Sequence, residues 1–298
     1  MKRFAILALT ALTVGACSKK AEYDAPAAGY GTLALTAECS TTVETTARAR
    51  TSSGADHTGQ VPLPEGAYTI PKAKELGLRI ESADPTYDFL QSWAAAALYD
   101  PHNDWLWATD YIVTLFSGDE YVGIDAIPEG IDLPYFEGSA RLRVLAGIEP
   151  TNVRIKARVM NTIVRIAFTD RFKGYFANGA TFKLTTAAGN EFTVGYTAED
   201  PATSEIYHYI RPAAFTISGE ATKQRPSASM EAQTVKFADT INAAPEASTL
   251  YTYTFDLSDA GSTDAVVITL NDVPIRTETI DEELNDDAKP DPISQRLR

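Results

Sequence analysis

The residue with the clearest chemical role in the sequence is Cys17. It follows a Val-Gly-Ala segment at positions 14–16, and the four residues together resemble a bacterial lipobox, in which a small residue before the cysteine admits the signal peptidase. Basic residues at positions 2 and 3 precede an apolar run over residues 4–14 that is too short to cross a bilayer. A diacylglycerol on the thiol, with a further acyl chain, would anchor the protein without a transmembrane helix. We therefore expect a cleaved signal peptide over residues 1–16 and lipid attachment at Cys17.

The residues after Cys17 bear on where the lipoprotein resides. Ser18 does not resemble an inner-membrane retention signal, which favours the outer membrane. Acidic residues follow within the segment 18–24 (SKKAEYD), with a weak similarity to the export signals of Bacteroidetes surface lipoproteins. The periplasmic face and the cell-surface face of the outer membrane both remain open.

A second group of residues with chemical potential lies between positions 93 and 107, where all three tryptophans of the chain fall. On a β-scaffold, flat aromatic rings can stack on sugar rings while nearby polar groups supply hydrogen bonds. Two interpretations remain open, a glycan-binding surface and rings that fill the core, which is the commoner role of large aromatic side chains. Trp105 and Trp107 would share one face at strand spacing. The candidate ligand-binding residues are Trp93, Trp105, Trp107, His102, Asn103 and Asp104.

The sequence contains no motif that predicts catalysis. A dinucleotide-binding glycine pattern, a phosphate-binding loop, a His-Glu-x-x-His helix and a Gly-x-Ser-x-Gly elbow are all missing. The three histidines, at positions 57, 102 and 208, are too dispersed for a metal motif. We therefore predict no catalytic residues, no metal and no cofactor. A glycosidase-like pair of carboxylates, which needs only two separated acids, is a distant alternative.

The other cysteine, Cys39, has no partner for an intramolecular disulfide once Cys17 is lipidated. It follows Leu33, Leu35 and Ala37 at a period of two, the pattern of a half-buried strand. We expect a packed thiol rather than a nucleophile.

The elements that would position these residues are predicted to be β-strands. The run from Tyr111 to Phe116 is almost continuously apolar and is typical of a central strand. Between positions 153 and 159, apolar residues alternate with three basic ones. The apolar set then shifts phase to 164, 166 and 168, which predicts a bulge or a change of sheet near residues 161–162. We place the junction of two domains there.

Beyond that junction, short alternating runs separated by turn residues recur as far as residue 270, the spacing of a β-sandwich. The predicted fold is therefore all-β, with two tandem β-sandwich domains of Ig-like type. Residues 40–60, rich in Ser, Thr and Gly, are predicted to be a surface loop. The predicted divisions are a signal peptide over 1–16, a flexible tether over 17–29, an N-terminal domain over 30–160, a C-terminal domain over 161–281 and a disordered acidic tail over 282–298.

Charge and loop composition limit the partners. With 40 acidic and 26 basic residues, the net charge of −14 disfavours nucleic-acid binding. Arg48 and Arg50 lie in the predicted surface loop, where a trypsin-like protease could cut. Processing there and an uncut polar loop both remain open.

The middle of the chain resembles a Bacteroidales lipoprotein family known only as domain of unknown function number 4493. The likeness runs through the motifs YIVTLFSG at 111–118, GID at 123–125 and LPYFEG at 133–138, and through the strands up to Phe168. It covers roughly residues 30 to 195. The resemblance implies fimbrillin-like, type V pilus-associated adhesins built from transthyretin-like sandwiches, and it brings no catalytic residues with it.

Together these observations predict a lipid-anchored envelope protein with a structural or adhesive role, with an anchor or accessory subunit of a fimbria as one form of it. The membrane, through Cys17, and fimbrial subunits are the expected partners. The alternative is a glycan-binding surface lipoprotein that uses the segment from Trp93 to Trp107 to hold host or dietary glycans.

Overall fold

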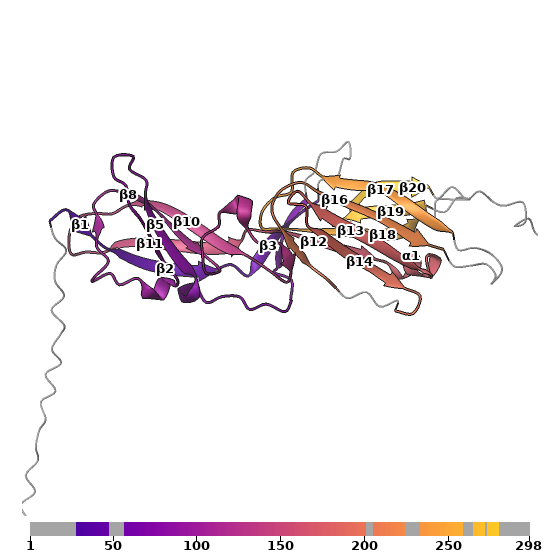
Figure 1. The fold of residues 1–298 in the computed structure, drawn as a ribbon, viewed down its shortest axis with the longest axis horizontal. Helices are drawn as coiled ribbons and strands as arrows, with labels where there is room; N and C mark the ends of the chain where they lie inside the picture. The colour runs from indigo at the N-terminus through magenta and orange to yellow at the C-terminus, as the bar shows by residue number, and fades with distance from the viewer. Residues whose placement is uncertain are drawn as a thin grey trace, which may run out of the picture.

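The computed structural model describes residues 28–47, 57–200, 205–223, 233–258, 265–271 and 273–279. The predicted signal peptide, Cys17, nearly all of the tether, Arg48, Arg50 and the acidic tail lie outside these ranges. The predictions made for them therefore stay predictions. Figure 1 shows two lobes placed end to end along the longest axis, with the earlier strands in indigo and magenta and the later strands in orange and yellow.

The described residues are mostly β, in four sheets. Side chains that alternate between apolar and polar favour strands with one buried face, and this alternation is the cause of the architecture. A two-stranded sheet joins β1 (Tyr30–Gly31) and β7 (Leu106–Trp107). A six-stranded sheet has the order β2 (Leu33–Cys39), β11 (Thr151–Val159), β10 (Phe136–Arg143), β8 (Asp110–Phe116), β5 (Gly77–Ser82) and β6 (Leu90–Trp93).

The other two sheets lie mainly in the later part of the chain. The eight-stranded sheet has the path β20 (Val273–Thr279), β19 (Ala265–Leu270), β18 (Thr249–Ser258), β12 (Thr162–Phe168), β15 (His208–Ile210) and β9 (Gly130–Ile131), with β3 (Thr42–Ala47) and β4 (His57–Pro62) attached beside β18. The four-stranded sheet has the order β14 (Glu191–Thr197), β13 (Gly179–Thr186), β16 (Phe215–Thr222) and β17 (Thr234–Asn242).

Helical structure is brief in the described ranges. Thr169 caps the N-terminus of the α-helix α1 (Asp170–Tyr175), because its hydroxyl accepts a hydrogen bond from the Phe172 amide. The Phe172 ring is fully buried. The 3-10 turns are η1 (Ala73–Glu75), η2 (Ala96–Leu98) and η3 (Ile124–Ala126).

The first core lies against the inner face of the six-stranded sheet. β11 shows its origin clearly, because Val153, Ile155, Ala157 and Val159 are buried while the alternating basic residues are exposed, as the sequence predicted. Side chains from the segment before β5, from the segment around Tyr99 and from β3 close this core. Cys39 is half-buried against it, and burial raises the pKa of its thiol. That placement agrees with a packing role.

The second core lies between the eight-stranded and four-stranded sheets. Strands β12, β18 and β19 supply residues such as Val164, Tyr253 and Ile268 from one side, and β13 and β16 supply Phe182 and Ile217 from the other. Several phenylalanine rings meet there, including Phe182 and Phe255 with centroids 4.2 Å apart. Large rings in contact contribute both buried area and favourable ring geometry.

The chain changes sheet between β11 and β12, where the sequence predicted a bulge or a sheet change. Asn161 fixes the turn, because its side-chain oxygen accepts a hydrogen bond from the Tyr135 amide at 2.6 Å and its amide group donates to the Pro128 carbonyl. Immediately after it, Ile163 packs in the first core and Val164 in the second. Neighbouring side chains of one strand thus point to opposite faces and into different cores.

Segments from before this change of sheet also enter the eight-stranded sheet. The β3–β4 hairpin pairs with β18, and β9 pairs with β15. Because of these exchanges, the division into domains over 30–160 and 161–281 stays a prediction, as does the pair of tandem sandwiches.

The predicted loop over residues 40–60 is partly wrong. Residues 42–47 and 57–62 are the strands β3 and β4, paired in antiparallel register. Thr-rich segments have a high β-propensity once a neighbouring strand is available, and here β18 supplies it. Composition alone could not reveal that neighbour.

Candidate functional site

The aromatic segment is built from short elements at one side of the first lobe. β6 ends at Trp93, η2 follows, and Asp100-Pro101 ends the helical turn before β7 begins. A proline disfavours a helical conformation in the residue before it, which explains the stop. The short helical turn η2 begins at Ala96, within a run of four alanines.

Trp107 is the most exposed of the three tryptophans, with 42% of its surface accessible. Its ring meets Tyr30 edge-on, with centroids 5.1 Å apart, because β1 and β7 pair these two residues. Gly29 adopts φ +88°, and a Cβ there would lie 2.7 Å from the indole. A glycine is therefore required both by the backbone conformation and by the close approach of the ring.

The other two tryptophans are half-buried and lie in separate surroundings. Trp93 packs edge-on against Tyr99, with centroids 5.3 Å apart, at the border of the first core. Among the described residues, no ring contact joins any two of Trp93, Trp105 and Trp107. The structure therefore does not bring the three indoles together as one stacking surface.

The polar candidates His102, Asn103 and Asp104 lie in a turn whose residues hydrogen-bond to one another. Asp100 accepts hydrogen bonds from the His102 amide at 2.9 Å and from the Asn103 side chain, and its own amide donates to the Asp104 carboxylate at 2.7 Å. The bond from the His102 amide is the main cause that lowers the pKa of Asp100. Much of the hydrogen-bonding capacity of these carboxylates is thus used within the turn.

Tyr99 connects this turn to the edge strand β2. Its hydroxyl accepts a hydrogen bond from the Leu33 amide at 3.1 Å and donates to the Asp104 carbonyl at 3.3 Å. Burial is the main cause that raises the pKa of Tyr99 to about 12, so the phenol is neutral and can donate at physiological pH. No local sequence pattern indicates this role, since a tertiary contact between residues 33 and 99 defines it.

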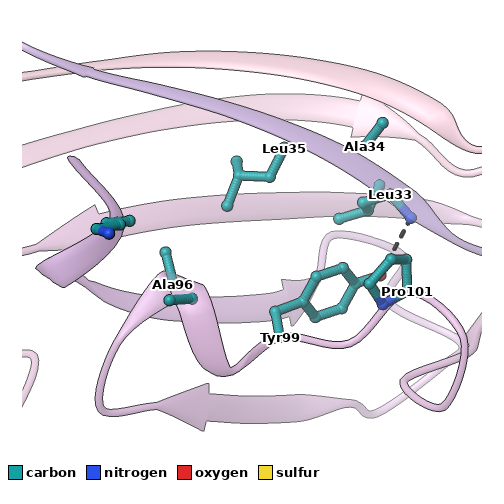
Figure 2. A pocket seen from close by; sticks show the side chains of 8 residues that line it. Leu33, Ala34, Leu35, Ala96, Tyr99 and Pro101 are labelled. Carbon is teal, nitrogen blue, oxygen red and sulfur yellow. Dashed lines mark hydrogen bonds between the residues drawn. The ribbon is translucent and has the colours of Figure 1, made fainter.

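A groove of about 320 Å³ opens between β2 and the η1–η2 region. Figure 2 shows Leu33 and Leu35 on the β2 side, Ala96 and Tyr99 facing them, and the hydrogen bond from Leu33 to Tyr99 at one end. The lining residues are Leu33, Ala34, Leu35, Lys74, Ala96, Ala97, Tyr99 and Pro101. None of the predicted site residues lines the groove, although Trp93 and Asp104 contact its wall through Tyr99.

In the described ranges, no group of three or more His, Cys, Asp or Glu side chains is placed to hold a metal ion. No helix in the same residues has the length and apolar character needed to cross a membrane.

Comparisons with solved structures find distant likenesses over most of the chain. One is a candidate cell adhesion protein of Bacteroides ovatus, at 9% identity and a TM-score of 0.37, covering 85% of this chain and 99% of that one. Another, from Bacteroides fragilis, has 9% identity, a TM-score of 0.35, and coverages of 86% and 100%. A fimbrial assembly protein of Parabacteroides distasonis has 11% identity, a TM-score of 0.32, and coverages of 66% and 90%.

No curated protein matches the chain. The comparison with protein families, in contrast, does identify it. The model of the domain of unknown function DUF4493 matches residues 99–286. The resemblance seen in the sequence is thereby confirmed, although the match begins later than residue 30 and continues well beyond residue 195. This chain belongs to the DUF4493 family.

Proposed function

We propose that this protein is a lipid-anchored protein of the outer membrane that projects from the envelope in a structural or adhesive role. The observation that carries the proposal is the position of β1, which lies at one end of the long axis while β19 and β20 lie in the other lobe (Figure 1). A lipid at Cys17 would therefore hold the molecule by one end.

The distances suit such an arrangement. Twelve residues separate Cys17 from Tyr30, and a fully extended chain of that length spans about 45 Å at most. The first lobe would then stand near the membrane and the second would face outward. The end of that outer lobe that carries α1 (Figure 1) is the natural contact surface for a partner.

The anchor is tested by mass spectrometry of the mature N-terminus from the native host. The proposal predicts a protein that begins at an acylated Cys17, and a Cys17→Ser variant that is neither acylated nor sedimented with membranes. A mature chain that starts elsewhere, or a Cys17 without acyl chains, would remove the anchor. Protease treatment of intact cells distinguishes the surface from the periplasmic face, because only a surface protein is digested before lysis.

The structural or adhesive role is tested in cells that lack the protein. Purified fimbriae that contain the chain, and that shorten or detach when it is deleted, would identify an anchor or accessory subunit. Reduced attachment to immobilised host or dietary glycans, with normal fimbriae, would identify an adhesin. A deletion strain with normal attachment, normal fimbriae and an unchanged envelope would contradict the proposal.

A second candidate function is glycan binding by the aromatic segment, and the exposed indole of Trp107 favours it. Iodide quenching of tryptophan fluorescence tests it, because an accessible ring is quenched and a stacked sugar shields it. We expect Trp107→Phe to remove most of the quenchable emission. If glycans leave the quenching of the unaltered protein unchanged, the segment is not a sugar platform.

A further inference from the structure

The outer face of β11 is basic, although the whole chain has a net charge of −14. Arg154, Lys156 and Arg158 are exposed on this face. Arg154 is neutralised by an ion pair with Glu38 on β2. Lys156 and Arg158 have no ion pair with any residue that the structure describes. Two adjacent positive charges are thus available on an otherwise acidic protein.

These two side chains line a polar pocket of about 210 Å³ where β11 meets the β3–β4 hairpin. Hydroxyl groups of Ser40, Thr42 and Ser248 contribute to the wall, with Glu44 and Gln60 beside them. The volume is below the usual range for drug-sized ligands, which suits a single sugar ring rather than a longer segment. The pocket therefore combines two cations with several neutral hydrogen-bonding groups.

Ser248 gives an independent indication that the pocket binds a ligand. Its residue surface is 5% exposed, yet its hydroxyl has no hydrogen-bond partner within the described ranges. Its backbone adopts φ +62°, which is uncommon for a residue other than glycine. Hydrogen bonds from its amide to the Asn161 carbonyl and to its carbonyl from the Glu44 amide hold it there. A hydroxyl in the pocket wall that makes no hydrogen bond within the described protein is free to bond a hydroxyl or oxyanion of a ligand.

We propose that this pocket binds a sugar residue that carries a negative charge, such as a uronic acid, at the end of or within an acidic glycan. Lys156 and Arg158 would bind the carboxylate through charge-assisted hydrogen bonds. Glu44 and Gln60 would accept hydrogen bonds from the sugar hydroxyls. A bare phosphate or sulfate fits less well, because it lacks the sugar hydroxyls that would donate to the Glu44 carboxylate and to Gln60.

The inference needs neither the lipid anchor nor the aromatic segment, so it can fail or hold independently of the proposed function. The test uses the soluble chain from residue 18 and isothermal titration with a galacturonic acid trisaccharide. The neutral galactose trisaccharide and inorganic phosphate serve as comparison ligands. We expect the acidic trisaccharide to bind, the neutral one to give no detectable heat, and phosphate to bind about tenfold more weakly or worse.

Variants locate the binding. The double variant Lys156→Gln/Arg158→Gln should lose about tenfold or more in affinity, whereas Arg154→Gln, on the same strand and face but outside the pocket, should lose less than about twofold. Ser248→Gly removes the hydroxyl in a residue that tolerates positive φ, and should lose about threefold without loss of thermal stability. Trp107→Phe should leave this affinity unchanged.

Several outcomes would overturn the inference. These are no binding of the acidic trisaccharide, equal binding of the neutral trisaccharide, or equal binding of phosphate. An equal loss in Arg154→Gln and in the double variant would show general attraction of anions by the basic face rather than a pocket. A loss confined to Trp107→Phe would move glycan binding to the aromatic segment. All variants are exposed or conformationally tolerated substitutions, and circular dichroism checks that each is folded.

Discussion

At the scale of single residues, His208 is the buried titratable group with the clearest consequence. It is fully buried on β15, beside the Phe192 ring, and its Nδ1 lies 3.3 Å from the Val164 carbonyl. Because a carbonyl only accepts, the neutral ring carries its proton on Nδ1 in this bond. Nε2 is buried with no partner among the described residues. Burial is the main cause that lowers the pKa of His208.

His208 should make stability depend on pH below about 6.5, the usual pKa of histidine in an unfolded chain. Between that value and the lower pKa of the folded state, the unfolded chain binds the proton and the native protein does not, so stability falls as pH falls. Thermal unfolding from pH 7 to pH 5 should show a decline for the unaltered protein and a shallower one for His208→Gln. Parallel curves for the two proteins would contradict this role.

Tyr99 gives a second prediction at this scale. Its hydroxyl satisfies the Leu33 amide, and Tyr99→Phe would leave that buried N–H without a partner. We expect a loss of about 1–3 kcal/mol in the free energy of unfolding, measured with urea. Tyr30→Phe is a matched control, because the Tyr30 hydroxyl has no hydrogen bond in the part of the chain described, and it should change stability by less than about 0.5 kcal/mol. Equal effects would assign no role to the Tyr99 hydroxyl.

From the sequence, residues with a suitable chemical type could be identified, but not which of them contact one another in the folded protein. Sequence reasoning identified Trp107 as a candidate surface ring, yet it grouped the three tryptophans, which the structure places in separate surroundings. It missed Ser248 and Tyr99, whose roles depend on residues far away in the chain. No local pattern marks a serine with positive φ or a tyrosine that caps a distant strand.

At the scale of elements, the pairing of β10 with β11 depends on Gly138. A Cβ at this position would lie 2.5 Å from the Lys156 carbonyl, so any larger residue must push the strands apart. We expect Gly138→Ala to reduce the free energy of unfolding by about 1–3 kcal/mol. Gly174→Ala, in α1 with open space around it, should instead be neutral or stabilising by up to about 1 kcal/mol. Urea denaturation of both variants checks the contrast, and equal effects would mean that the strands can separate freely.

The strands were predictable wherever one face meets a core. The alternation in β11 and the phase shift before β12 follow directly from burial on one face, and both are present in the structure. β3 and β4 were not predictable, because their pairing with β18 depends on a strand about 200 residues later. β20 was missed as well, since it continues the sheet beyond the last apolar run that the sequence analysis recognised.

At the scale of the whole molecule, the two lobes are joined by more than the covalent chain. The Glu129 carboxylate accepts hydrogen bonds from the Thr186 hydroxyl at 2.8 Å, from the Asn190 side chain at 2.6 Å and from the Arg211 amide at 2.9 Å. The Arg211 side chain in turn donates to the carbonyls of Ile127 and Asp125. These bonds tie the segment around η3 to β13, to the loop after it and to the end of β15.

The exchange of strands predicts that the C-terminal part does not fold alone. A fragment over residues 161–281 lacks β3, β4 and β9, which exposes the edges of β15 and β18 and the buried ring of Tyr209. We expect the complete chain to unfold in one transition and the fragment to lack dispersed amide signals in NMR spectra. A fragment with native-like spectra would instead support independent domains divided at residue 160.

The change of sheet at residues 159–162 has a mechanical consequence. β2 runs parallel to β11, and each continues across the junction, one into β3 and the other into β12, which both pair with β18 in parallel register. Two of the chain's crossings between the lobes, from β2 to β3 and from β11 to β12, therefore lie side by side. If the molecule is tethered at one end and pulled at the other, these crossings share the tension, and the second lobe resists rotation relative to the first more than it would with a single connecting segment.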